Sequence, residues 1–192
     1  RCIIKFIMPI QNEGILSGYL RKKRHIISLK YCKGSVLDFG SGDGSFSEYF
    51  EFDKYIGYEP DHDSIFEAKE IYKHKKFISS IEETKELEID TIAMIAVIEH
   101  LDDPEGTVEL LKNKFFSNRK GAFVITTPNK YFDQFHHFGA KLGLFSQHAA
   151  DEHNIMFNKK DLFIFAKKTN LEVIKFKRFL FGVNQLVVLK IN

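Results

Sequence analysis

The sequence predicts an α/β fold of three layers, in which helices cover both faces of a mostly parallel sheet. Short apolar runs alternate with amphipathic helical patterns up to about residue 128, as in chains of β/α units with right-handed crossovers. One of these runs, within residues 35–50 (SVLDFGSGDGSFSEYF), breaks into closely spaced glycines before a helix resumes. A strand–glycine turn–helix of this kind is typical of a site for a nucleotide-like ligand.

Length and composition indicate one globular domain, residues 1–192, with 44% hydrophobic and 28% charged residues. The formal net charge of +2 gives little reason to expect a polyanionic partner. Cys2 and Cys32 show no paired spacing, so we expect a reducing, cytoplasmic location. No apolar run approaches the roughly 18 residues of a membrane span, and the opening RCIIKFIMPI is too short and irregular for a signal peptide.

The N-terminal segment, residues 1–33, is expected to be helical. Apolar residues recur at helical spacing over residues 12–31, with four basic residues, 21–24, between them. These cations form a solvated face, or they attract an anionic substrate or the acidic group of a cofactor.

The glycine turn follows a buried strand that contains Val36, Leu37 and Phe39. A dinucleotide fingerprint is G-x-G-x-x-G. Here the glycines run Gly40-x-Gly42-x-Gly44, and Ser45 occupies the place of the third fingerprint glycine and begins the helix. Asp38 would place negative charge near the pyrophosphate of a dinucleotide, so the turn suits a cationic ligand better than a dinucleotide.

In these residues the sequence resembles the class I S-adenosylmethionine-dependent methyltransferases, whose first motif is D/E-x-G-x-G-x-G. Asp38, Gly40, Gly42 and Gly44 match it. The resemblance implies a Rossmann-like methyltransferase fold and S-adenosylmethionine as the cofactor. It also implies that the loop, with Phe39 before it, wraps the methionine half of the cofactor while Asp38 holds its ammonium group.

A second strand, residues 54–58, ends at Glu59. An acid about 20 residues past such a loop accepts hydrogen bonds from ribose hydroxyls, and the resemblance gives Glu59 this role, with Pro60 beside it. The alternative is a surface carboxylate. Pro60 and Asp61 then start a helix.

The next two strands, residues 76–79 and 90–97, carry further cofactor positions by resemblance. Ser80 and Ile81 stand where the family contacts adenine, although Ser80 replaces the common Asp. Ala96 and Val97 are expected to line the cofactor, and His100, within the segment IEHL, to face the site.

Asp103-Pro104 begins another helix, and residues 122–127 form the fifth strand. Residues 129–157 are then too long for an ordinary connection, and they are rich in histidine and aromatic residues. We interpret them as a substrate cap over the carboxyl ends of the strands, with a packed aromatic insertion as the alternative. The segment IEHL resembles the E-H-[LIV] sequence of a broad branch of small-molecule methyltransferases. His148, Asp151 and His153 have metal-binding side chains, but by resemblance that branch does not generally need a metal, so none is expected.

Asn158 is expected to cap a helix, and residues 171–180 and 185–191 form two strands joined by a short hairpin connection. Seven strands with an antiparallel last strand are the class I arrangement, so the resemblance runs from about residue 36 to the end.

The predicted function is methyl transfer to an oxygen or nitrogen of a small molecule, such as a quinone precursor, a sugar or glycan intermediate, or another metabolite. His100 and His153 are the candidate bases for a hydroxyl acceptor. Nucleic acid is an unlikely target, because neither cysteine follows the fourth strand and the segment AVIEH lacks the [DN]-P-P-[YF] motif. The alternatives are a non-catalytic cofactor-binding or scaffold protein and, disfavoured by the glycine spacing, a nicotinamide-dependent dehydrogenase. The oligomeric state does not follow from the sequence.

Overall fold

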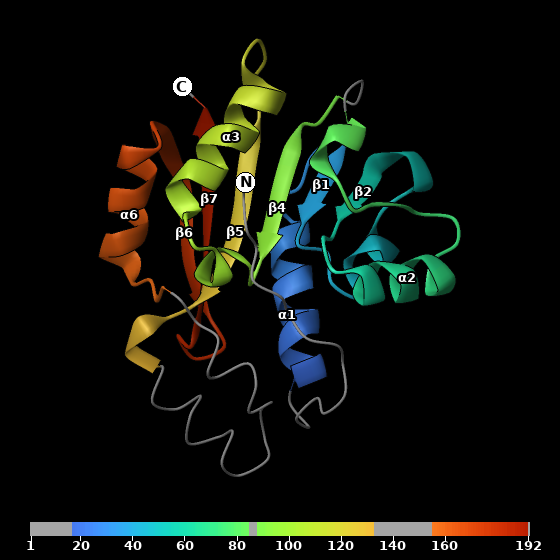
Figure 1. The fold of residues 1–192 in the computed structure, drawn as a ribbon. Helices are drawn as coiled ribbons and strands as arrows, with labels where there is room; N and C mark the ends of the chain where they lie inside the picture. The colour runs from blue at the N-terminus through green and yellow to red at the C-terminus, as the bar shows by residue number, and fades with distance from the viewer. Residues whose placement is uncertain (1–16, 85–87, 133–154, 192) are drawn as a thin grey trace.

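The computed structural model describes residues 17–84, 88–132 and 155–191 (Figure 1). The strands are β1 (Val36–Phe39), β2 (Tyr55–Tyr58), β3 (Lys76–Ile78), β4 (Thr91–Ile95), β5 (Ala122–Pro128), β6 (Leu171–Phe179) and β7 (Asn184–Ile191). The α-helices are α1 (Ser17–Leu29), α2 (His62–Ile71), α3 (Pro104–Phe116) and α6 (Lys159–Lys168). Short 3₁₀ helices are η1 (Ser45–Tyr49), η2 (Phe52–Lys54), η3 (Ile81–Thr84), η4 (Ile98–His100) and η5 (Lys130–Phe132).

The seven strands form one sheet in the order β3-β2-β1-β4-β5-β7-β6. β1 to β5 are parallel to one another, and β7 is antiparallel to both β5 and β6. The predicted mostly parallel sheet is therefore confirmed. The chain leaves β1 toward β2 and later returns to the other side of β1 with β4, so the strand order reverses there. Ligands of open α/β sheets bind at such a switch point, beyond the carboxyl ends of the strands, which point downward in Figure 1.

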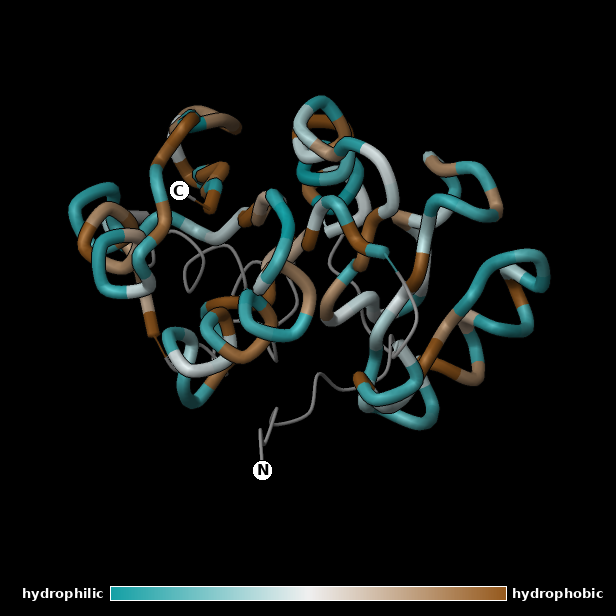
Figure 2. The backbone as a smooth tube through the Cα atoms, turned by 90° about the horizontal axis from the view of Figure 1, so that it is seen from above, coloured by the Kyte–Doolittle hydropathy of each residue, from teal (hydrophilic) through white to brown (hydrophobic). Residues whose placement is uncertain are grey.

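Helices cover both faces of the sheet. Successive strand residues point their side chains to opposite faces, so the buried strands place apolar side chains on each face. On β1, Leu37 belongs to a core shared with α3 and α6, whereas Val36 packs with residues of α2. A third apolar cluster joins Ile27 of α1 to Val124 of β5. Figure 2 shows hydrophilic and hydrophobic residues alternating along the flanking helices, as expected for helices covered on one side.

Three helices begin at the residues that the sequence predicted. Asp61 accepts the Ser64 N–H at 3.0 Å at the start of α2, and Asp103 accepts the Gly106 N–H at 2.8 Å at the start of α3. Asn158 forms a reciprocal capping box at the start of α6. These caps satisfy backbone amides that have no partner within the helix.

The helix expected from Ser45 is only the short 3₁₀ helix η1. Aromatic packing explains this difference, because residues 45–54 must also carry the chain back to β2. Phe50 is already extended, and its ring packs against Phe46 at 4.9 Å and against Tyr55 of β2 at 5.4 Å between ring centroids.

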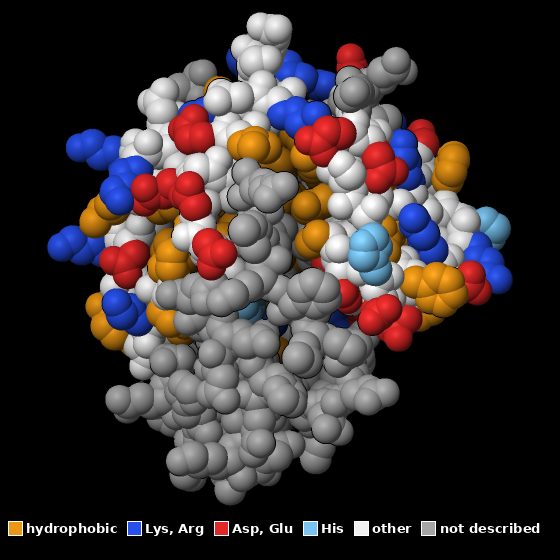
Figure 3. Space-filling view, in the orientation of Figure 1, with side chains coloured by type: hydrophobic (Ala, Val, Ile, Leu, Met, Phe, Trp, Pro, Cys, Tyr) orange, Lys and Arg blue, Asp and Glu red, His pale blue; other side chains and the backbone are white. Residues whose placement is uncertain are grey.

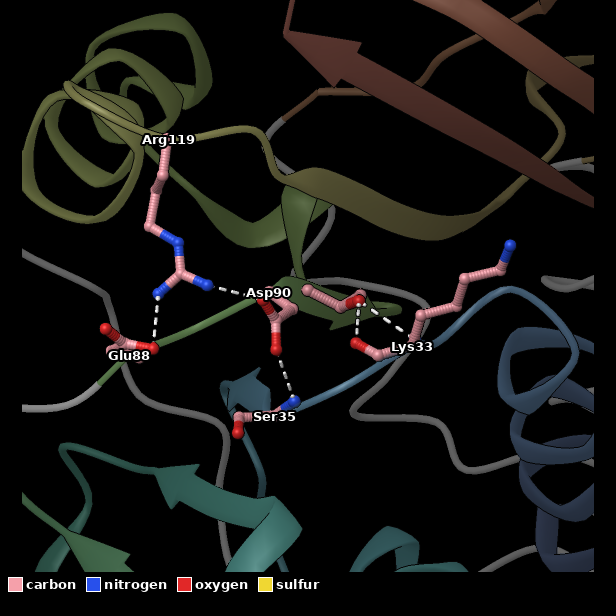
Figure 4. Close-up of polar contacts among 6 residues, drawn as sticks. Lys33, Ser35, Glu88, Asp90 and Arg119 are labelled. Carbon is pink, nitrogen blue, oxygen red and sulfur yellow. Dashed lines mark hydrogen bonds and ion pairs between the residues drawn. The ribbon is translucent and has the colours of Figure 1, made fainter.

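A polar network joins β1 and β4 at the amino edge of the sheet, opposite the predicted site (Figure 4). Asp90 accepts the Ser35 N–H at 2.9 Å and pairs with Arg119 at 2.5 Å. A Cβ on Gly34 would lie 2.0 Å from Asp90 Oδ2, so glycine is required there for close approach. In the described ranges, no helix is long and apolar enough to cross a membrane.

Candidate functional site

The glycine loop lies at the carboxyl end of β1 and is held by β2. Gly40, Gly42 and Gly44 have φ values of 78°, 51° and 75°, in the left-handed region that favours glycine. The N–H groups of Gly40 and Ser41 both donate to the Tyr58 carbonyl, at 2.8 and 2.9 Å. The loop conformation thus depends on the three glycines and on the end of the neighbouring strand.

The three glycines face different surroundings. A Cβ on Gly40 would lie 2.7 Å from Val97 Cγ2, and one on Gly44 would lie 2.6 Å from Phe77 Cζ. A Cβ on Gly42 would have no heavy atom within 4 Å. Gly40 and Gly44 therefore permit close internal packing, whereas the backbone at Gly42 faces open space that a ligand can approach.

Glu59 is attached to this loop through both of its carboxylate oxygens. Oε2 accepts the Gly42 N–H at 2.9 Å, and Oε1 accepts the Asp61 N–H at 3.0 Å. The side chain is only 3% exposed. Burial raises the pKa of Glu59, and the two backbone N–H groups oppose that rise. Glu59 therefore links the end of β2 to Gly42, the residue at which the loop is open.

Asp38 lies buried beneath the loop, on the β1 face that packs against α1 and α2. Its Oδ2 accepts a hydrogen bond from the Tyr55 hydroxyl at 2.6 Å. Burial raises the pKa of Asp38 to about 7; the Tyr55 hydrogen bond opposes the rise, and the negative charges of Glu59 and Asp43 add to it. A cation bound nearby would favour ionised Asp38, so the environment of this carboxylate suits an ammonium group.

Helix α1 is docked on the loop by its basic residues. Arg21 pairs with Asp43 at 2.9 Å, and Asp43 also accepts the Ser45 N–H at 3.0 Å. His25 packs on the Phe46 ring at a centroid distance of 4.9 Å, and burial lowers the pKa of His25 to about 4. Part of the basic cluster of residues 21–24 therefore holds the loop and is not a free solvated face.

The carboxyl end of β4 brings other predicted residues beside the loop. Val97 packs against Gly40, where it leaves no room for a Cβ. Ala96 has a φ of 57°, which is uncommon for a residue with a side chain. The Ala96 N–H donates to the Thr126 carbonyl of β5 at 2.9 Å. His100 is half-buried at the end of η4, where its N–H donates to the Val97 carbonyl at 2.9 Å.

Glu99 is a buried acid that the sequence reasoning did not single out. It is 0% exposed, and neither carboxylate oxygen has a hydrogen-bond partner among the described residues. Its charge acts on Arg24 of α1, where it opposes the lowering of the Arg24 pKa by burial. The Arg24 Nε–H donates to Asn184 Oδ1 at 2.9 Å. Buried polar groups are nearly always paired, so the unsatisfied carboxylate of Glu99 is an exception beside the end of β4.

The remaining predicted site residues are Ser80, Ile81, Pro60 and His153. The Ser80 hydroxyl donates to Glu82 Oε2 at 2.5 Å, and the half-buried Ile81 packs on the core next to it. Pro60 is half-buried after Glu59. His153, like most of the predicted cap 129–157, lies outside the described residues. Within the described ranges, no group of three or more metal-binding side chains occurs.

The sequence reasoning missed one contact and one buried acid. The strand pattern KYIGY placed Tyr55 in β2 but gave no signal for its bond to Asp38. Glu99 lies within the predicted IEHL segment, and an acid after an apolar strand was the only available signal for it.

The seven-stranded sheet, with left-handed glycines at its switch point, has the Rossmann-like fold of the class I methyltransferase type. Residues 12–175 match the family described as "Methyltransferase domain". The chain therefore belongs to this methyltransferase family, which bears out the resemblance and its cofactor, S-adenosylmethionine. A search of curated proteins finds no match.

Solved structures share the fold at low sequence identity. A S-adenosylmethionine-dependent methyltransferase from Thermotoga maritima, described as a possible histamine N-methyltransferase, has a TM-score of 0.66 at 15% identity, over 91% of this chain and 92% of that one. Magnesium protoporphyrin IX methyltransferase from Synechocystis, with bound S-adenosylhomocysteine, has a TM-score of 0.65 at 11% identity, over 98% and 89%. A S-adenosylmethionine-dependent methyltransferase from Archaeoglobus fulgidus has a TM-score of 0.64 at 16% identity, over 90% and 93%.

Proposed function

We propose that this protein transfers the methyl group of S-adenosylmethionine to an oxygen or nitrogen of a small molecule. The observation that carries the proposal is the glycine loop, which is open to a ligand at Gly42 and lies above the buried carboxylate of Asp38. When bound, the cofactor supplies a methyl group already activated by a sulfonium. The protein then has to position the acceptor in line and exclude water.

The residues at the switch point fit this cofactor. Asp38 would hold the ammonium group, and the backbone of Gly40 to Gly44 would lie along the methionine half. Glu59 would accept hydrogen bonds from ribose, because a carboxylate has about four acceptor positions and the two amides use only part of that capacity. Ala96 and Val97 would line the cofactor, and Ser80 and Ile81 would lie on the adenine side.

Three side chains are candidates to activate the acceptor. His100 and His153 are the candidate bases, because imidazole titrates near neutral pH. Glu99 joins them, since its free carboxylate oxygens can accept a hydrogen bond from an acceptor hydroxyl or amine. Residues 129–157 would cover the acceptor, and we place the protein in the cytoplasm.

A small-molecule acceptor, such as a quinone precursor, a sugar or glycan intermediate or another metabolite, remains favoured over nucleic acid. The alternative of a non-catalytic cofactor-binding protein predicts cofactor binding without transfer. No catalytic metal is proposed.

Two measurements test the proposal in sequence. Calorimetry should show binding of S-adenosylmethionine and S-adenosylhomocysteine and much weaker binding of NAD and ATP; tighter binding of NAD would refute the cofactor assignment. Purified protein with methyl-labelled cofactor is then incubated with fractionated cell extract. Label in a small-molecule fraction supports the enzyme, and binding without transfer in any fraction supports the non-catalytic alternative.

A further inference from the structure

A hollow of about 490 Å³ lies beside the carboxyl edge of the sheet, away from the glycine loop. Its walls come from η5, the start of α6 and the end of β6, which lie together at the lower left of Figure 1. The lining residues are Tyr131, Asn158, Lys159, Lys160, Phe163 and Arg178. The volume falls within the range of small-molecule sites, about 300–1,000 Å³.

Hydrogen bonds hold the walls in place. Gln185, opposite Arg178 in the β6–β7 register, donates from Nε2 to the Phe157 carbonyl at 2.7 Å. The same carbonyl accepts the Lys130 N–H at 2.9 Å. The chain entering α6 is therefore tied to both β7 and η5, and the hollow is preformed.

The charge of the hollow is strongly positive. Lys159, Lys160 and Arg178 line it without any acidic lining residue, and none of the three forms an ion pair within the described part of the chain. Asp161 follows Lys160 in the sequence, but its carboxylate takes part in the α6 capping box, where it accepts the Asn158 N–H at 3.0 Å. The amino end of α6 adds partial positive charge. Figure 3 shows that the flank over α6 carries Lys and Arg side chains together with acidic ones, so the excess of positive charge is confined to the residues that line the hollow.

Exposed aromatic side chains accompany the cations. Tyr131 is 70% exposed and Phe163 is 42% exposed. Lys159 Nζ lies 5.4 Å from the ring centroids of both Phe163 and Phe176, so this cation is held at the wall. Three cations match a diphosphate better than a singly charged carboxylate, since even one phosphate monoester carries about −1.5 to −2 charges at pH 7. The rings offer surfaces on which a planar group can stack.

We propose that this hollow binds the diphosphate end of the methyl acceptor, which is then a nucleoside-diphosphate-like ester. This step rests on the proposed methyl transfer. β6 and β4 run in the same direction, so the hollow and the end of β4 share one edge of the sheet. Three strand spacings separate them, about 14 Å. An acceptor with its phosphates at β6 must therefore extend over this distance to place its methylated atom near Glu99 and His100.

The test uses uridine diphosphate as the probe, in calorimetry on protein saturated with S-adenosylhomocysteine so that the cofactor site is blocked. We expect uridine diphosphate to bind and uridine not to bind. The double variant Lys160→Gln/Arg178→Gln should weaken the binding at least tenfold. Lys167→Gln, which removes an exposed cation of the same helix outside the hollow, should leave it unchanged.

Equal binding by the double variant, or no binding of uridine diphosphate to the parent protein, would overturn the assignment of the hollow. The titration is repeated without S-adenosylhomocysteine. If the parent protein binds uridine diphosphate through Lys160 and Arg178 but does not bind S-adenosylhomocysteine, the diphosphate site stands and the proposed methyl transfer fails.

Discussion

Substitution of Glu59 by Gln tests whether this carboxylate holds the glycine loop or only contacts the cofactor. In the cofactor-free structure both oxygens already accept backbone amides, from Gly42 and from Asp61. Gln keeps one acceptor oxygen and replaces the other by an NH₂ donor. One of the two amides must therefore lose its partner, even before any cofactor binds.

The magnitude follows from two opposing effects. A hydrogen bond to a charged acceptor contributes about 1.5–3 kcal/mol, but burial disfavours the Glu59 charge, as its raised pKa shows. Neutral Gln avoids part of that burial cost, so we expect a net loss of about 1–2 kcal/mol in the free energy of unfolding. For a chain of this size, the loss corresponds to a fall in Tm of roughly 2–8 °C.

Thermal unfolding of cofactor-free protein, followed by circular dichroism, measures this loss, and calorimetry measures the affinity for S-adenosylmethionine. Both stability and affinity should fall in Glu59→Gln. Glu67→Gln, at an exposed acid of α2, is the matched control and should shift stability by less than about 0.5 kcal/mol. If Glu59→Gln weakens cofactor binding but unfolds at the same temperature as the parent protein, the loop is not held by Glu59 and the carboxylate acts on the cofactor alone.

Four further substitutions test Asp38, Glu99 and the glycine loop. Because the pKa of Asp38 is raised from 3.8 to about 7, the native state holds a proton that the unfolded chain releases, so stability should fall as the pH rises from about 4 to about 7. Asp38→Asn should remove that fall in Tm and weaken cofactor binding; an unchanged pH profile would contradict the reasoning. Glu99→Gln should lower methyl transfer with little effect on cofactor affinity, because it removes a carboxylate acceptor that we propose for the acceptor substrate; equal loss of cofactor affinity and of transfer would show a structural role. In urea unfolding, Gly42→Ala should cost about 1–2 kcal/mol through its left-handed backbone, and Gly44→Ala should cost more because Phe77 must move; equal costs would contradict the packing argument.

Several features could be predicted from the sequence because local chemistry encodes them. The caps at Asp61, Asp103 and Asn158 depend on a side chain and an amide a few residues apart. The alternation of apolar runs predicted the strands and their mostly parallel order. The spacing of Gly40, Gly42 and Gly44 predicted a tight turn, and the structure gives all three residues the left-handed backbone that glycine adopts at low cost.

Other features depend on which distant segments meet, and no local pattern encodes them. The helix expected after Ser45 became a short 3₁₀ helix because Phe46 and Phe50 pack against neighbouring elements and turn the chain back to β2. Tyr55 reaches Asp38 only because β1 and β2 are adjacent in the sheet.

The charge environment also required the tertiary structure. A carboxylate in the sequence has no defined burial, so the raised pKa of Asp38, the two amide partners of Glu59 and the unpaired oxygens of Glu99 follow only from folding. The class of cofactor could be predicted from residues adjacent in the chain, because the motif that carries the family resemblance lies within one short loop. The two places that we propose for the acceptor, at Glu99 of η4 and at the hollow beside Arg178, combine residues of η4, β6, η5 and α6. Residues so far apart in sequence become neighbours only when the chain folds.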